Sequence, residues 1–211
     1  LLTRAALAGL LELAQQSRLE EDIEALFDGA HVNNTENRPA LHTLLRASGS
    51  HGMDAEFEQV AASRALMRQW SERLNDGRQT GFSGAAITDV VNIGIGGSDL
   101  GPRLVTEALR PFHGNISCHY VANVDPADLQ DTLLELDPGS TLFIVCSKSF
   151  RTEETLTNSL AARNWLLNAG AVEGDLDKHF IAVTANLAAA AEFGIPAANC
   201  LPMWDWVGGR Y

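Results

Sequence analysis

The chain has 211 residues, 45% of them hydrophobic, and a formal net charge of −12. This length suffices for one substantial core, or for a core with a small helical annex. The acidic balance, with no cluster of positive charge, excludes binding to the phosphate backbone of nucleic acids. No stretch approaches the roughly 20 apolar residues of a membrane span. The sequence therefore predicts a folded protein with neither a nucleic-acid nor a membrane partner.

The cysteines and the first residues of the chain indicate the cellular compartment in which the protein is found. Three cysteines, an odd number, stand far apart in apolar surroundings at positions Cys118, Cys146 and Cys200. That pattern favours buried thiols in a reducing compartment over disulfides or a zinc site. The first stretch, Leu1 to Leu13, carries Arg4 and Glu12 and has no small-residue cleavage pattern behind it. We expect a cytoplasmic protein without a metal site.

Residues 1–76 have the periodicity of helices. Apolar residues recur at helical spacing from Leu1 to Leu13, Leu19 to Phe27 and Phe57 to Leu74, and no convincing strand lies among them. A turn signal, Asn75-Asp-Gly-Arg78, follows the third helix. We expect residues 1–76 to form a helical N-terminal layer and residues 77–211 to form a second domain.

Residues 77–211 alternate between short β-branched runs and helical stretches. The expected strands are Ile87 to Ile95, Ile116 to Val124, Leu142 to Cys146, Phe180 to Thr184 and Leu201 to Trp206, with Trp204 and Trp206 alternating into the core of the last one. The expected helices are Leu100 to Leu109, Pro126 to Leu134, Thr152 to Asn168 and Leu187 to Phe193. Such alternation predicts an α/β fold: a three-layer αβα sandwich around about five parallel strands.

The first strand runs into a glycine-rich turn, Gly94-Ile-Gly-Gly-Ser-Asp-Leu-Gly101. Glycines let the backbone approach a ligand closely, and Ser98 offers a hydroxyl where a helix begins, as in a phosphate-binding turn. An ordinary strand-to-helix turn with Ser98 or Asp99 as N-cap is an equal alternative. A dinucleotide fingerprint does not fit, because Asp99 stands where the third glycine belongs, and no Gly-Lys-Ser/Thr of a P-loop follows.

The third strand runs into a hydroxyl-rich segment, Ser147-Lys-Ser-Phe-Arg-Thr-Glu-Glu-Thr155. Hydroxyls and backbone N–H groups at a helix start can surround the oxygens of a phosphate ester, and Lys148 adds charge. The alternative is a capping box, but a cap needs one hydroxyl and the segment holds four. Because ligands bind at the carboxyl ends of parallel strands, both loops are expected to share one pocket.

Four segments resemble the phosphoglucose isomerase family, in the family's order. Thr88 to Pro102 resembles its first sugar-isomerase signature, and Ser147 to Thr155 is similar to its Ser-Lys-Thr-x-Thr-Thr-x-Glu-Thr phosphate loop. Asn33 to Arg38, together with Leu41 to Arg46, resembles its Asn-x-Thr-Glu-x-Arg segment, and Asp205 to Tyr211 resembles the opening of its central signature. Ser149 and Arg151 stand where the phosphate loop of the family has threonines; Ser149 keeps the hydroxyl, and Arg151 either strengthens anion binding or points to solvent.

The resemblance implies roles for residues of this chain. The substrate and phosphate would be bound by Gly97, Ser98, Ser147, Lys148, Ser149 and Thr152. Glu154 would support the phosphate loop without contacting the substrate itself. Arg210 would be the catalytic arginine that stabilises a cis-enediol intermediate. The family interconverts glucose 6-phosphate and fructose 6-phosphate as a homodimer, with no cofactor.

The same resemblance implies that the acid–base residues are not among these 211. The family's catalytic glutamate, histidine and lysine lie beyond the central signature, and the six histidines here are expected to be surface or packing residues. We therefore expect an N-terminal portion of an isomerase that is inactive alone. A non-catalytic sugar-phosphate-binding regulatory module is the alternative, and a nucleotide-binding protein is disfavoured by the glycine spacing.

Overall fold

The structure is a computed structural model that describes residues 2–208. Contacts divide the chain into two compact units. Among the described residues, one unit combines the chain up to Ala62 with residues 205–208, and the other runs from Ser63 to Trp204. The units meet in the sequence inside one long helix, α3 (Asp54–Asn75). The domain boundary expected after residue 76 remains a prediction.

The first unit is built from helices, as the periodicity predicted. It contains α1 (Arg4–Gln16), α2 (Leu19–Phe27), the 3-10 helix η1 (His42–Arg46) and the first part of α3. The hydroxyl of Thr3 accepts the N–H of Ala6 at 3.1 Å and caps α1. Among its described residues, the only β pairing is an isolated antiparallel bridge between Asn33 and Arg38. None of the residues of α1 and α2 is buried.

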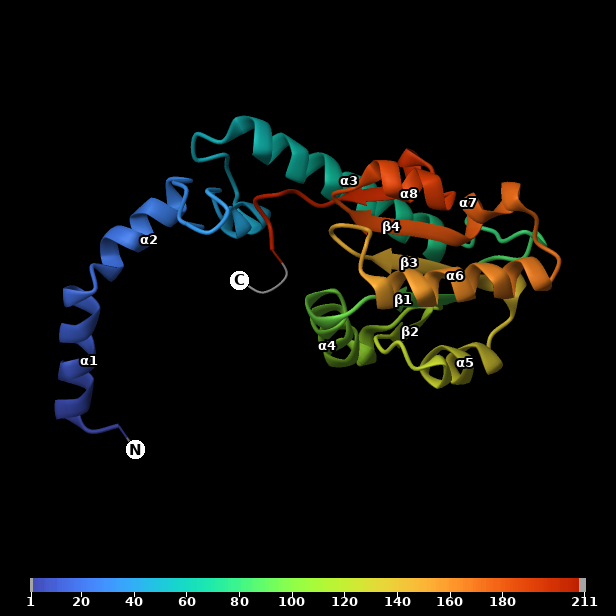
Figure 1. Ribbon diagram of the computed structural model, residues 1–211, viewed down its shortest axis with the longest axis horizontal. Helices are drawn as coiled ribbons and strands as arrows, with labels where there is room; N and C mark the ends of the chain where they lie inside the picture. Colours follow the sequence, from blue (N-terminus) through green and yellow to red (C-terminus); the bar gives the residue numbers. More distant parts are fainter. Residues whose placement is uncertain (1, 209–211) are drawn as a thin grey trace. The chain divides into compact units, whose positions relative to one another are not determined.

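The second unit is a five-stranded sheet in which every paired neighbour is parallel. Its strands are β1 (Asp89–Ile93), β2 (Ser117–Val121), β3 (Thr141–Cys146), β4 (Phe180–Thr184) and β5 (Cys200–Pro202), in the order β2-β1-β3-β4-β5 (Figure 1). The remaining helices are α4 (Leu100–Ala108), α5 (Pro126–Leu134), α6 (Glu153–Asn168), α7 (Leu176–His179) and α8 (Leu187–Phe193). This confirms the predicted α/β class.

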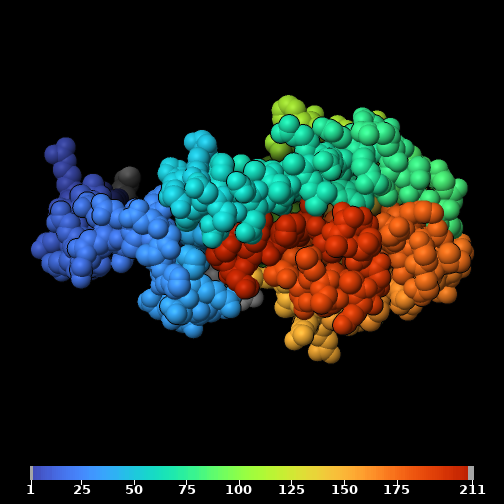
Figure 2. All heavy atoms as spheres, turned by 90° about the horizontal axis from the view of Figure 1, so that it is seen from above, coloured from blue at the N-terminus to red at the C-terminus, as the bar shows by residue number. Residues whose placement is uncertain are grey.

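Helices pack on both faces of the sheet and complete three layers. On one face, alternate strand residues such as Val91, Phe143 and Phe180 form a buried cluster with side chains of α5, α6 and α8. On the other face, Val90, Leu142 and Ile181 pack with Trp70 of α3. In the space-filling view, the second part of α3 lies alongside the β4–β5 region (Figure 2). The two-residue alternation of a strand explains this division, because successive side chains point to opposite faces.

Two expectations about the last strands need correction. The strand expected from Leu201 to Trp206 ends at Pro202, so Trp204 and Trp206 do not alternate on it, and both are half-buried. Beyond the strand, the carbonyl of Trp206 accepts the N–H of Leu41 at 3.1 Å, which ties this segment to the first unit. The short helix α7 was not expected, because four residues are too few to show helical periodicity.

Candidate functional site

The order of the strands reverses between β1 and β3, which is where open parallel sheets bind their ligands. From β1 the chain crosses to β2 on one side, whereas β3, β4 and β5 follow in sequence on the other. In open parallel sheets the ligand lies outside the carboxyl ends of the strands at this reversal of order. Ile93 of β1 pairs with Val145 of β3, so the two following loops leave the sheet side by side. These are the glycine-rich loop (residues 94–98) and the hydroxyl-rich loop (residues 147–152).

The glycine-rich loop is packed too tightly to admit larger residues at its start. A Cβ added at Gly94 would lie 2.8 Å from Cβ of Ser98 and 3.0 Å from Cβ of Cys146. The loop then turns through Gly96, which has φ +59°, into a short 3-10 helix (η2, Gly96–Ser98). Gly97 is exposed and Ser98 is half-buried at the end of this turn. The loop therefore presents Gly97 and Ser98 at the carboxyl end of β1.

Capping does not explain this loop. Asp99 is the N-cap residue of α4, but its side chain makes no capping hydrogen bond to a backbone N–H of the helix. Its buried carboxylate instead accepts from the guanidinium of Arg103, with Nη2 2.8 Å and Nε 3.1 Å from Oδ1. The negative charge is thus paired within α4, where it does not oppose an anion at Ser98.

In the hydroxyl-rich loop, side chains face one another rather than the helix. The Ser147 and Thr152 hydroxyls are 3.1 Å apart, and the Ser149 hydroxyl accepts the N–H of Arg151 at 3.2 Å. Thr152 is the N-cap residue of α6, yet its side chain makes no capping hydrogen bond. The capping alternative is therefore not realised, and the first-turn N–H groups of α6 are left to other acceptors. Such groups favour an anion.

Neighbouring segments fix the backbone of this loop from behind. The carbonyl of Lys148 accepts the N–H of Ala185 at 2.9 Å and the hydroxyl of Thr184 at 3.1 Å. The amide of Asn186 donates to the carbonyl of Ser149 at 3.0 Å, while its oxygen caps α8 through the N–H of Ala189. Two carbonyls of the loop are therefore held by Thr184, Ala185 and Asn186, the residues between β4 and α8 and the last residue of β4.

The loop also contains a strained residue. Phe150 has φ +51°, an unusual conformation for a bulky side chain. Its ring is 2% exposed and meets Phe193 of α8 edge-on at 5.9 Å between centroids. Burial of the ring holds the strained turn in place, because leaving it would expose the phenyl group to water.

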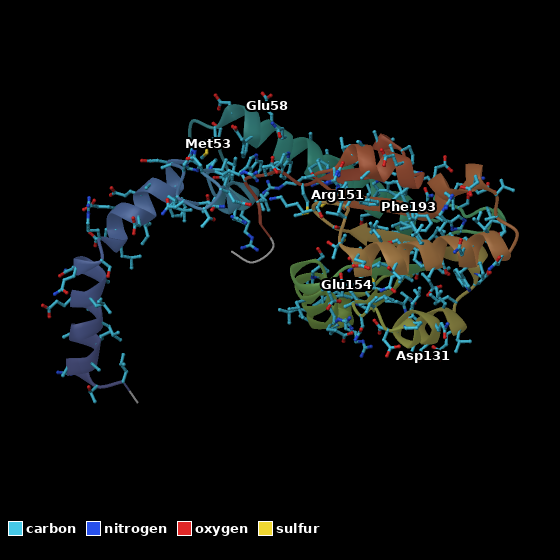
Figure 3. All side chains as sticks on the ribbon, in the orientation of Figure 1. Met53, Glu58, Asp131, Arg151, Glu154 and Phe193 are labelled. Carbon is cyan, nitrogen blue, oxygen red and sulfur yellow. The ribbon has the colours of Figure 1, made fainter. Side chains whose placement is uncertain are left out.

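The charged residues of the loop differ in position. Arg151 is exposed and, with Glu192, borders a hollow of about 400 Å³ whose apolar lining includes Phe150 and Phe193. Figure 3 labels Arg151, Phe193 and Glu154, the half-buried second residue of α6. Lys148 is half-buried. Arg210, the expected catalytic arginine, lies outside the described residues.

Two findings concern metal binding and membrane insertion. Within residues 2–208, no group of three or more His, Cys, Asp or Glu side chains is placed to hold a metal ion. Over the same residues, no helix is both long enough and apolar enough to cross a membrane.

The sequence reading missed the residues that support the loops. Thr184 is the last residue of β4 and Asn186 follows that strand just as the loop residues follow β1 and β3, so the rule used for those strands applied here too. Asn92 gave a different signal, a polar residue among the buried residues of β1, the others of which are apolar. Its amide donates to the carbonyl of Ser98 at 3.0 Å, and its oxygen accepts from the thiol of Cys146 at 3.1 Å.

The sheet order and the two loops at its reversal define a doubly wound α/β protein with a candidate site for a small anionic ligand. The model of the phosphoglucose isomerase family matches residues 1–211. The chain belongs to the phosphoglucose isomerase family, as its motifs indicated.

Individual relatives agree with the family. The chain is 51% identical over 203 residues to a glucose-6-phosphate isomerase of Saccharophagus degradans, covering 96% of this chain and 37% of that protein. It is 50% identical over 207 residues to one of Shewanella pealeana, covering 96% and 38% respectively. The crystal structure of a glucose-6-phosphate isomerase from Chlamydia trachomatis is similar with a TM-score of 0.79 and 27% identity, over 99% of this chain and 40% of that one. The chain thus spans well under half the length of these relatives.

Proposed function

We propose that this chain forms the sugar-phosphate-binding part of a glucose-6-phosphate isomerase, which interconverts glucose 6-phosphate and fructose 6-phosphate in glycolysis and gluconeogenesis. The observation that carries the proposal is the pair of adjoining loops at the reversal of strand order, one rich in glycine and the other in hydroxyls. The names of the relatives support the substrate.

In this proposal the phosphate lies between the two loops. Gly97 and Ser98 contact it from one side, and Ser147, Lys148, Ser149 and Thr152 from the other. The Ser147 and Thr152 hydroxyls can share one hydrogen bond and still leave a proton for the ligand, because each hydroxyl both donates and accepts. Glu154 supports the loop from the first turn of α6.

The chemistry belongs to the longer protein. Proton transfer between C1 and C2 needs a base of tuned pKa, and the resemblance places the glutamate, histidine and lysine beyond the central signature. Arg210 would stabilise the charge that develops on the cis-enediol, since a guanidinium stays cationic at any working pH. No cofactor is proposed, because the sugar carbonyl itself acidifies the transferred proton. The 211 residues alone would bind substrate without turning it over.

The proposal extends to assembly and location. The longer protein would be a homodimer in the cytoplasm, as the family resemblance implies. The thiols of Cys118, Cys146 and Cys200 are all free, which fits a reducing compartment.

Calorimetric titration of glucose 6-phosphate into the 211-residue chain tests this function. We expect Ser147→Ala to weaken binding roughly two- to tenfold, as the loss of one hydrogen bond predicts. Thr157→Ala is the matched control, since it removes a hydroxyl from an exposed side chain further along α6. Equal affinity of the Ser147→Ala and wild-type chains, or equal losses in both variants, would contradict the assignment.

A further inference from the structure

Asn92 is the polar residue among the four buried positions of β1, where Val90, Val91 and Ile93 are apolar. It is 7% exposed, and its neighbours Val91 and Ile93 are fully buried on the opposite face of the sheet. A buried amide costs stability unless its groups are hydrogen-bonded, so its presence in β1 calls for an explanation. Apolar packing alone would favour valine or isoleucine here.

The partners of this amide are the last residue of the glycine-rich loop and the residue directly before the hydroxyl-rich loop. The carbonyl of Ser98 can only accept, so the NH₂ group of Asn92 faces it, at 3.0 Å. The oxygen of the same amide then faces the thiol of Cys146, which donates at 3.1 Å. Ser98 ends the glycine-rich loop, and Cys146 is the last residue of β3, directly before Ser147.

Gly94 makes a third contact between the glycine-rich loop and the end of β3. Gly94 lies so near Ser98 and Cys146 that an added Cβ would be 3.0 Å or less from both side chains' Cβ atoms. The first loop is therefore held to the end of β3 by two hydrogen bonds through one amide and by close packing at one glycine.

We propose that Asn92 and Cys146 are positioning residues that set the spacing between the two phosphate-binding loops. This inference rests on the proposed function. A phosphate that bridges both loops needs donors from each at hydrogen-bonding distance simultaneously, and a displacement of one loop by 1 Å loses one set of contacts. Fixing the spacing before the ligand arrives also removes the cost of ordering the loops on binding.

The chemical state of Cys146 suits a structural donor. Burial raises the pKa of its thiol to about 12, because the thiolate would lose its hydration. The group therefore keeps its proton and is a poor nucleophile. A donor that does not titrate in the physiological range holds the Asn92 oxygen at any working pH.

Substitutions at Cys146 give the cleanest test, by calorimetric titration of glucose 6-phosphate into the 211-residue chain. We expect Cys146→Ala to weaken binding about two- to threefold, since a thiol is a weak donor. Cys146→Ser keeps a donor and should bind within roughly 1.5-fold of the wild-type chain. Cys200→Ala is the matched control, because it removes a buried thiol at the start of β5 that donates to the carbonyl of Pro196 at 3.5 Å. It should change stability but not affinity.

Asn92→Leu removes both hydrogen bonds at similar volume, and we expect it to weaken binding about tenfold. Combining it with Cys146→Ala should cost no further affinity, because the thiol has already lost its partner. Urea unfolding of each variant shows that it is folded, and the Cys146 pair carries the test should Asn92→Leu not fold.

The outcomes separate this inference from the proposed function. If Ser147→Ala weakens binding while folded Cys146→Ala and Asn92→Leu bind as the wild-type chain does, the positioning role is wrong and the phosphate site stands. Loss of affinity in Cys146→Ser equal to that in Cys146→Ala would also overturn it. If the wild-type chain binds no glucose 6-phosphate, the proposed function fails and this inference with it.

Discussion

At the scale of single residues, His179 is an imidazole enclosed by the second unit. Its side chain is fully buried; Nδ1 lies 2.6 Å from the carbonyl of Thr141, and Nε2 lies 2.8 Å from the backbone nitrogen of Phe82. Because a carbonyl only accepts and an N–H only donates, Nδ1 carries the proton and Nε2 is the acceptor. The neutral ring thus joins β3 to the turn before β1, and protonation of Nε2 would break one of its bonds.

This arrangement predicts a loss of stability in mild acid. Burial lowers the pKa of His179 below its ordinary 6.5, against an opposing contribution from its hydrogen bond to Thr141. As the pH falls below about 6.5, the imidazole of His179 is protonated in the unfolded chain but stays neutral in the folded chain. The free energy of unfolding therefore declines. The decline ends at the folded pKa, and its slope is at most about 1.4 kcal/mol per pH unit.

Urea unfolding between pH 8 and pH 5 measures this slope. The control is His179→Leu, which should be less stable at pH 8 but should show a flatter dependence between pH 6.5 and pH 5. Parallel pH profiles for the two chains would show that His179 does not cause the loss.

At the scale of elements, the turn between β1 and α4 depends on the absence of a side chain at Gly94. An added Cβ would lie 2.8 Å from Cβ of Ser98 and 3.0 Å from both the Ser98 carbonyl oxygen and Cβ of Cys146. We expect Gly94→Ala to displace the loop and to weaken glucose 6-phosphate binding at least roughly tenfold, since a 1 Å misplacement of a binding group is costly.

Gly101 provides the matched control for this turn. It lies in the first turn of α4, and an added Cβ there would meet nothing within 4 Å. Gly101→Ala should therefore keep the affinity and stabilise the chain by up to about 1 kcal/mol through helix propensity. Isothermal titration and urea unfolding of both variants test the contrast, and equal behaviour of the two alanine variants would contradict it.

The helices of the first unit lead to a prediction about local stability. None of the residues of α1 and α2 is buried, and the apolar residues Leu10, Leu11 and Phe27 are more than half exposed. Isolated helices of 13 and 9 residues are marginal in water without a packed face. We expect their amides to exchange hydrogen at least about 100-fold faster than those of β1, β3 and β4.

Hydrogen exchange followed by mass spectrometry or NMR checks this expectation. The buried strands serve as the internal reference, since Val91, Phe143 and Phe180 are not exposed at all. Protection of α1 and α2 as strong as that of these strands would mean that the helices are covered in solution.

At the scale of the whole molecule, we expect the 211-residue chain to bind substrate but to show no measurable isomerase activity. Binding of the phosphate accelerates the reaction only when it positions C1 and C2 against a proton-transferring group. Loss of a general base alone costs roughly 10²–10⁴-fold in rate. The relatives are much longer, and in our proposal the acid–base residues lie in that remainder.

The assay couples fructose 6-phosphate turnover to detection of glucose 6-phosphate, with protein freed of host isomerase. A chain of full family length is the positive control. Activity that co-purifies with the 211-residue species and disappears in Arg210→Ala would contradict the prediction.

Local sequence patterns were enough to predict the α/β class of the fold and the two loops that form the candidate site. Burial on a strand repeats every two residues and on a helix every 3.6, so the alternation of elements is visible in local patterns. Polar residues after an apolar run also stand out locally, which is how Ser98 and the 147–152 loop were found. The predicted extension of the last strand to Trp206 was wrong, because Trp204 and Trp206 alternate in sequence without belonging to a strand.

The contacts between side chains that are distant in sequence become visible in the tertiary structure alone. The strand order that makes β1 and β3 neighbours brings Asn92 to Cys146 across 54 positions of sequence, and His179 to Phe82 across 97. Neither pairing has a local signature, because the sequence around Asn92 or His179 would be the same whichever group the side chain contacts. Such contacts follow from the order and register of strands, which are set by the packing of the whole sheet against its helices.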